Sequence, residues 1–337
     1  EAPQATIINT GSIASNSTAI LGADIVTLLM NEGSITGDVR FSSEADQFMN
    51  TGEVTGAVSL SGGDDLIVNT GSITGDVTAG AGADIFMNDG GVITGNVDLG
   101  AGDDMAALSI ASNVSGLVDG GDGNDTLNIF GDVAEGEEAE LAGFTSFEQL
   151  GLAVNGAVSF AEASTFGNVD IFGGSNLQIN DSVLDVVSIS SEGPIALALN
   201  ENTTITSTGA ATVQLNGGSQ FVNAGSIVAA ENAVRSSGNN SQLINDGSIE
   251  AGGSGFNLTD VDTVVVANTG TITSAADAVS LQNGANVMLM NTGTIESEAG
   301  GIVAASVSSS LLINEGSITT SGVGGHGLSA GGGQDNV

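Results

Sequence analysis

Aspartates recur at nearly constant spacing in the first part of the chain, and their carboxylates are the side chains best placed for chemistry. The series comprises Asp24, Asp46, Asp65, Asp84, Asp104 and Asp125. If neighbouring carboxylates lie about 5 Å apart, each pair repels by roughly 0.8 kcal/mol in water and about 3 kcal/mol at an effective dielectric of about 20. Calcium suits such a row, because it accepts many oxygen ligands in irregular geometry. The alternative is that these side chains face water and form turns through local hydrogen bonds.

A repeated phrase, Asn-x-Gly-x-Ile/Val, indicates which elements would position these aspartates. It begins at Asn9, Asn31, Asn50, Asn69, Asn88 (with one extra Gly), Asn223, Asn245, Asn268, Asn291 and Asn314. Within a repeat, apolar and polar residues alternate, as in SITGDV at residues 34–39, which is the period of a strand. The pattern predicts an all-β fold, a right-handed parallel β-solenoid with coils of 19–23 residues.

Adding the repeat length predicts which side chains stack between coils. One inward column is Ile35, Val54, Ile73 and Ile93. We also expect the residues just before each Asn, such as Met30, Met49 and Met87, to lie in the core. The asparagines should hydrogen-bond along the stack, and the Gly two residues later should supply a positive φ.

Repeat length also divides the chain into three segments. Residues 1–131 form a solenoid with 19–22-residue coils and Gly/Asp turns, residues 132–222 form irregular coils, and residues 223–337 form a solenoid with 22–23-residue coils. Asn336 stands where another repeat would begin, so we expect coils to continue beyond residue 337. Uncovered coil faces present unpaired backbone groups, which predicts end-to-end self-association as a possible partnership.

Repeats such as LMNTGTI at residues 289–295 and LINEGSIT at 312–319 resemble the passenger domains of bacterial autotransporters. The resemblance covers most of the chain and implies a parallel β-solenoid. It also implies export across a Gram-negative outer membrane and display at the cell surface. Because the shared phrase is architectural, it implies no particular activity.

Residues 120–128, GGDGNDTLN, are similar to the calcium-binding nonapeptide Gly-Gly-x-Gly-x-Asp-x-apolar-x of repeats-in-toxin proteins. Partial copies occur at residues 62–65, 80–84 and 100–104, once per coil rather than in tandem. In that family the ion lies between turns and is held by the sixth-position Asp and by turn carbonyls. The resemblance therefore implies calcium as the cofactor. The candidate metal ligands are Asp65, Asp84, Asp104, Asp122 and Asp125.

The charged residues of the chain are almost all acidic. The chain has 40 Asp and Glu residues against two basic ones, Arg40 and Arg235, and a net charge of −38. Nucleic acids and anionic lipids need a basic footprint, so neither is an expected partner. No apolar run is long enough for a membrane-spanning helix. The chain has no Cys, which is common in bacterial extracellular proteins.

These observations favour a secreted, non-enzymatic protein of the bacterial cell surface, a structural or adhesive rod stiffened by calcium. No catalytic residues are predicted, because His326 is the only His and the two Arg residues stand far apart in repeat register. Two alternatives stay open: a self-assembling extracellular filament or surface-layer subunit, and a polysaccharide-active β-helix enzyme. The host or matrix ligand also stays open.

Overall fold

The computed structural model describes residues 4–22, 24–161 and 164–331. It is a parallel β-solenoid of about 15 turns, with no helix among these residues, which confirms the predicted all-β solenoid. No helix in these ranges could therefore cross a membrane. The repeat expected to open at Asn336 lies outside the described residues. The chain divides into two compact units: unit 1 is Glu1–Asp132 with Ala142–Gly151, and unit 2 is Val133–Leu141 with Leu152–Val337.

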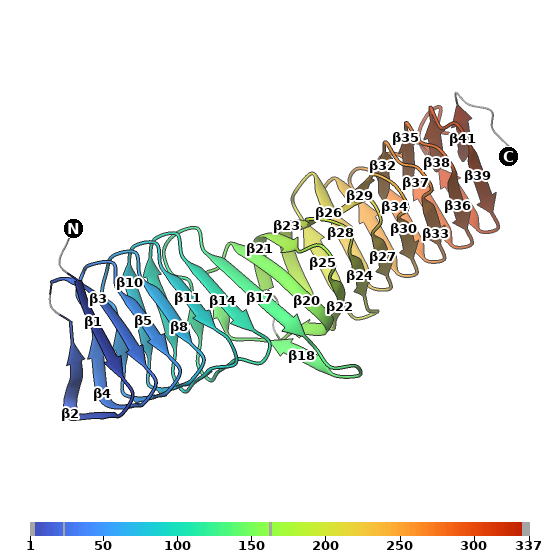
Figure 1. Ribbon diagram of the computed structural model, residues 1–337. Helices are drawn as coiled ribbons and strands as arrows, with labels where there is room; N and C mark the ends of the chain where they lie inside the picture. Colours follow the sequence, from blue (N-terminus) through green and yellow to red (C-terminus); the bar gives the residue numbers. More distant parts are fainter. Residues whose placement is uncertain (1–3, 23, 162–163, 332–337) are drawn as a thin grey trace. The chain divides into compact units, whose positions relative to one another are not determined.

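Unit 1 stacks short strands in columns, each strand pairing in parallel with the strand one coil later (Figure 1). One column holds β1 (Gln4–Asn9), β3 (Val26–Asn31), β5 (Gln47–Asn50), β8 (Leu66–Asn69), β11 (Ile85–Asn88), β14 (Met105–Ser109) and β17 (Thr126–Asp132). A second sheet holds β2 (Ser12–Leu21), β4 (Ser34–Arg40), β6 (Glu53–Thr55), β7 (Val58–Ser59), β9 (Ser72–Thr74), β10 (Val77–Ala81), β12 (Val92–Ile93), β13 (Val97–Ala101), β15 (Asn113–Val114), β16 (Val118–Asp119) and β19 (Phe144–Thr145).

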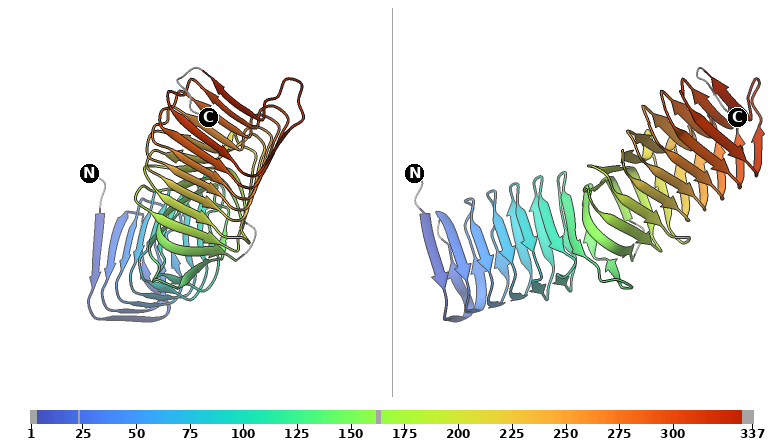
Figure 2. Two further views of the ribbon diagram at one scale, coloured as in Figure 1. Left: turned by 90° about the vertical axis from the view of Figure 1, so that its right-hand side faces the viewer. Right: turned by 45° about the vertical axis from the view of Figure 1, so that its right-hand side comes forward.

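Unit 2 stacks its strands in three columns (Figure 2). The first holds β18 (Glu138–Leu141), β20 (Gln149–Phe160), β22 (Asn176–Asn180), β24 (Ala196–Leu199), β27 (Gln220–Asn223), β30 (Gln242–Asn245), β33 (Val265–Asn268), β36 (Val287–Asn291) and β39 (Ser310–Asn314). The second holds β21 (Ser164–Ile171), β23 (Val183–Ser191), β25 (Thr204–Ser207), β28 (Ser226–Ala229), β31 (Ser248–Ala251), β34 (Thr271–Ser274), β37 (Thr294–Ser297) and β40 (Ser317–Thr320). The third holds β26 (Ala211–Asn216), β29 (Asn232–Ser237), β32 (Phe256–Thr259), β35 (Val279–Gln282), β38 (Ile302–Ala305) and β41 (Leu328–Gly331).

Strand register gives the coil lengths directly. In unit 1 the column from β1 to β17 advances by 22, 19, 19, 19, 20 and 21 residues per coil. In unit 2, two coils exceed the predicted range: Ala196 pairs with Gln220, and Ile302 pairs with Leu328. The extra residues of the longer coil lie in the turn around Val323, which is fully exposed. Surface turns tolerate such insertions without disturbing the stack.

Inward side chains form continuous apolar columns. Ile35, Val54, Ile73 and Ile93 are at most 1% exposed, as predicted. The prediction that the methionines before the asparagines are core residues is wrong, because Met87 is 37% exposed while Asn88 is fully buried. Alternation along a strand explains the error: an inward Asn forces its neighbour outward.

The glycine two residues after most of the stacked asparagines has a different role from the predicted one, whereas Gly90, two residues after Asn88, has the predicted positive φ, at 69°. Gly33, Gly52 and Gly71 do not have a positive φ. A Cβ on Gly33 would lie 2.0 Å from the carbonyl oxygen of Gly11, one coil earlier, and Gly52 and Gly71 meet the preceding coil in the same way. These positions therefore require Gly because successive backbones approach too closely for any side chain.

Candidate functional site

Five aspartates of unit 1 form a single row, here called the Asp ladder. Each stands directly before the first residue of a strand in the column from β5 to β17, so the strand register brings them together. At most 2% of each residue is exposed. The members are Asp46, Asp65, Asp84, Asp104 and Asp125.

Each rung of the Asp ladder joins two neighbouring coils. The Oδ1 of Asp65 accepts a hydrogen bond from the backbone N–H of Asp46, with an N–O distance of 2.6 Å. The equivalent distances for the acceptors Asp84, Asp104 and Asp125 are 2.8, 2.7 and 2.8 Å. Oδ1 of each of these carboxylates therefore accepts a backbone N–H of the neighbouring coil, in the place of a backbone carbonyl oxygen.

Both ends of the Asp ladder are closed by other residues. At one end the N–H of Thr27 donates to Oδ1 of Asp46, and the N–H of Ser42 donates to Oδ2 at 3.2 Å. At the other end the N–H of Asp125 donates to Oε2 of Glu148 at 2.8 Å. Glu148 stands directly before β20, as each ladder aspartate stands directly before its strand, and its longer side chain accepts the equivalent backbone N–H.

The second oxygen is the unusual feature of the interior rungs. The Oδ2 atoms of Asp65, Asp84, Asp104 and Asp125 are buried and have no hydrogen-bond partner. A buried polar atom without a partner costs about 1–3 kcal/mol, and more when it carries charge. Four stacked coils thus each contain an oxygen suited to a proton or a cation.

Burial shifts the titration of these carboxyls. It raises the pKa of Asp65 to about 8 and that of Asp104 to about 6. Burial also raises the pKa of Asp84 and of Asp125. The hydrogen bond from the backbone N–H lowers each of these pKa values, but the effect of desolvation is larger. With no cation bound, Asp65 therefore holds a proton at neutral pH.

A second row in the same coils shows how a fully satisfied ladder is built. Asn50 donates from Nδ2 to Oδ1 of Asn69 at 2.8 Å, and Asn69 donates likewise to Asn88 at 2.8 Å. This Asn ladder confirms the predicted stacking of asparagines. An amide both donates and accepts, whereas an ionised carboxylate only accepts. The Asp ladder therefore lacks the side-chain to side-chain hydrogen bonds that join the asparagines. This difference indicates that the acidity of the aspartates has a function of its own.

Glycine turns precede the aspartates of the Asp ladder and let the backbones of successive coils approach closely. Gly82 and Gly102 have φ values of 139° and 144°, which favour Gly. A Cβ on Gly82 would lie 2.0 Å from the carbonyl oxygen of Gly63, and one on Gly102 would lie 1.8 Å from that of Gly82. The backbones of successive coils thus approach closely at the turn, two residues before Asp84 and Asp104 in sequence.

Two of the predicted residues lie outside the Asp ladder. Asp122 has an exposed side chain in its turn, where its N–H donates to the carbonyl of Gly100 at 2.8 Å. Asp24 is exposed as well, and Thr27 occupies the position that aligns with Asp46. The 22-residue step from Asp24 to Asp46 exceeds the 19-residue register between β3 and β5.

The arrangement limits the kind of metal site that these residues can form. Across residues 4–22, 24–161 and 164–331, no group of three or more His, Cys, Asp or Glu side chains is placed to hold a metal ion. An ion on the Asp ladder would therefore take carboxylate oxygens from no more than two rungs and its remaining oxygens from carbonyls or water. Calcium accepts such mixed oxygen sets.

Sequence reasoning missed Glu148 as the closing residue of the Asp ladder. Its position just before Gln149 repeats the pattern of an acid directly before a strand, and that was the available signal. Comparison with known proteins gives no further guidance: no family model, no curated protein and no solved structure matches this chain.

Proposed function

We propose that this chain is a structural or adhesive segment of a secreted, non-enzymatic protein at the bacterial cell surface. The uniform parallel stacking of coils, closed by side-chain ladders, supports a mechanical role. The autotransporter-like repeats, the lack of Cys and the net charge of −38 support the extracellular location. Nothing in this proposal requires a catalytic residue.

Calcium binding by the Asp ladder of unit 1 is the second part of the proposal. The observation that carries it is the row of buried Oδ2 atoms without partners on Asp65, Asp84, Asp104 and Asp125. A divalent ion shared between adjacent rungs would neutralise two carboxylates and tie one coil to the next. The carbonyls of the nearby glycine turns would supply further oxygen ligands of the kind that calcium prefers.

Protonation is the competing way to satisfy the same oxygens. Because the pKa of Asp65 is about 8 and that of Asp104 about 6, protons and calcium would compete for the ladder near neutral pH. Calcium should therefore stabilise the fold most above pH 8, where the carboxylates are ionised.

Thermal unfolding at pH 8.5, with calcium or with a chelator, tests the calcium site. A ligand that binds only the folded state stabilises it by about 2.7 kcal/mol at a hundredfold excess over its Kd. We expect calcium to raise the Tm of the native chain, and the double variant Asp104→Asn with Asp125→Asn to lose most of that rise. Asp98→Asn, which removes an exposed carboxylate on β13, is the matched control and should keep it. A native Tm that is the same in calcium and chelator refutes the calcium site.

Surface display is tested separately. An antibody against the chain should label intact cells of the producing organism. Labelling that requires lysis would contradict the proposed location without bearing on calcium.

A further inference from the structure

Arg235 is an unpaired cation on a strongly acidic protein. It is exposed on β29 and is the only Arg or Lys in unit 2. The other arginine, Arg40 in unit 1, pairs with Asp38, with an Nη2–Oδ2 distance of 3.0 Å. Within the described part of the chain, Arg235 has neither an ion-pair partner nor a hydrogen bond from its guanidinium.

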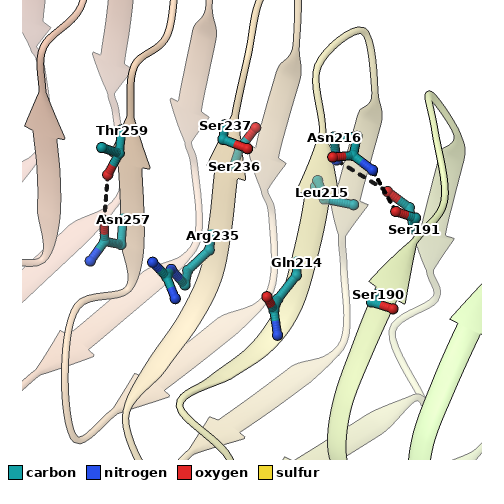
Figure 3. A pocket seen from close by; sticks show the side chains of 10 residues that line it. All are labelled: Ser190, Ser191, Gln214, Leu215, Asn216, Arg235, Ser236, Ser237, Asn257 and Thr259. Carbon is teal, nitrogen blue, oxygen red and sulfur yellow. Dashed lines mark hydrogen bonds between the residues drawn. The ribbon is translucent and has the colours of Figure 1, made fainter.

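The strand register places neutral polar groups on both sides of Arg235 (Figure 3). Gln214 on β26 is its partner on one side, and Asn257 on β32 is its partner on the other. Ser190 on β23 pairs with Gln214 and extends the row. The acid in this row, Asp170, lies beyond Ser190, about 14 Å or three strand spacings from Arg235. The guanidinium is therefore flanked by amides and not by acids.

These side chains line a hollow of about 260 Å³ in unit 2. Its rim is braced by three hydrogen bonds (Figure 3). The backbone N–H of Asn216 donates to Oγ of Ser191 at 3.1 Å and its Nδ2 donates to the carbonyl of Ser191 at 2.6 Å. Oγ1 of Thr259 donates to Oδ1 of Asn257 at 3.4 Å. Gln214 also lines the hollow, and its side-chain amide makes no hydrogen bond within the described part of the chain. The hollow thus combines one free cation with unused hydrogen-bonding capacity.

We infer that this hollow binds a saccharide unit that carries a carboxylate, with Arg235 pairing the carboxylate and the flanking amides and hydroxyls binding the sugar hydroxyls. A guanidinium offers two parallel N–H donors that match a carboxylate. The side-chain amide of Gln214 supplies both a donor and an acceptor, which sugar hydroxyls require. The inference goes beyond the proposed function and does not depend on calcium, because the Asp ladder lies in unit 1.

Size and charge narrow the ligand to a single acidic sugar. The hollow is slightly smaller than the range of about 300–1,000 Å³ that is usual for ligand pockets, so it suits one ring. The net charge of −38 repels polyanions, whereas an isolated carboxylate meets Arg235 within a Debye length of about 8 Å. Arg235 therefore selects a monoanionic sugar over a densely charged polymer.

Binding of methyl β-D-glucuronide to the full chain, measured by saturation-transfer NMR and calorimetry, tests the inference. The neutral methyl β-D-glucoside is the matched ligand. We expect the glucuronide to bind at least 10-fold more tightly than the glucoside, and Arg235→Gln to abolish this preference. Arg40→Gln removes the same charge from unit 1 and should leave the preference intact. Gln214→Glu, which places a carboxylate beside Arg235, should reduce glucuronide binding at least 10-fold.

Several results would overturn the site. They are equal binding of the two sugars by the native chain, an unchanged preference in Arg235→Gln, and an equal loss in Arg40→Gln. Sedimentation of the native chain and of Arg235→Gln adds a further check. Self-association that requires Arg235 would show that a carboxylate of a second copy occupies the hollow. The second copy would then replace the saccharide as the assigned ligand. Circular dichroism of each variant verifies the fold, which substitution of the exposed Arg235 and Gln214 should preserve.

Discussion

Replacing Asp65 with Asn should stabilise unit 1 in calcium-free buffer at high pH. The amide keeps an oxygen for the N–H of Asp46 and removes the charge from the buried, unpaired Oδ2. An unpaired amide is less costly to bury than an unpaired carboxylate. The gain should therefore grow as pH rises and be largest where the native Asp65 is ionised.

The pH dependence follows from the raised pKa. A carboxyl whose pKa is higher in the folded state contributes its full stability below the unfolded value and loses it as pH rises through the folded value. For Asp65 that window runs from the ordinary value of 3.8 to about 8. One pKa unit corresponds to about 1.4 kcal/mol, but local relaxation of the fold around an ionised carboxylate lowers the cost, so we expect about 1–3 kcal/mol.

Urea unfolding in chelator at pH 5 and pH 9 measures this effect. At pH 9, Asp65→Asn should have the higher free energy of unfolding by about 1–3 kcal/mol, and at pH 5 the gap should shrink to less than about 1 kcal/mol. Asp98→Asn, the exposed control, should show no such change with pH. If the gap fails to grow between pH 5 and pH 9, the assignment of a costly buried charge to Asp65 is wrong.

Two further substitutions test the other stacking features. Asn69→Ala leaves Oδ1 of Asn88 without a donor, whereas Nδ2 of Asn50 keeps two backbone acceptors, so urea unfolding should show a loss of about 1–3 kcal/mol. A loss below about 0.5 kcal/mol would show that the Asn ladder is dispensable. Gly82 has a φ of 139°, and a Cβ there would lie 2.0 Å from the carbonyl oxygen of Gly63, so the Tm of Gly82→Ala should fall much further than that of Gly11→Ala, where φ is not positive and a Cβ has no atom within 4 Å. Equal falls in Tm would contradict the close approach of the turns.

Repeat spacing was sufficient to predict the fold, because a parallel solenoid places equivalent residues of successive coils in contact. The buried column from Ile35 to Ile93 and the hydrogen bonds of the Asn ladder both follow from adding the period. The sequence predicted less well which side chains point into the core. Met87 was assigned to the core because the inward position of Asn88 was not recognised, and one reversed residue reverses its neighbours.

The Asp ladder could be found from sequence, but its chemistry could not. The spacing of Asp65, Asp84 and Asp104 indicated a row, yet only the structure shows that one oxygen of each accepts a backbone N–H and the other has no partner. Hydrogen-bond partners depend on coil separation and on the direction of the side chain, which a spacing does not encode. The exposure of Asp122 is equally a property of the turn and not of its motif.

The constant 19-residue register from β3 to β11 makes one of these coils interchangeable with the next, so length can change in whole coils during evolution. Loss of residues 51–69 would join Asn50 to Thr70 in the place of Thr51. Ile35 would then meet Ile73, and the N–H of Asp46 would meet Asp84, in the same geometry as the partners they lost. Duplication of the same segment adds a coil by the same rule. Recombination between repeats can thus lengthen or shorten the segment in steps of about 4.8 Å while requiring no new core packing.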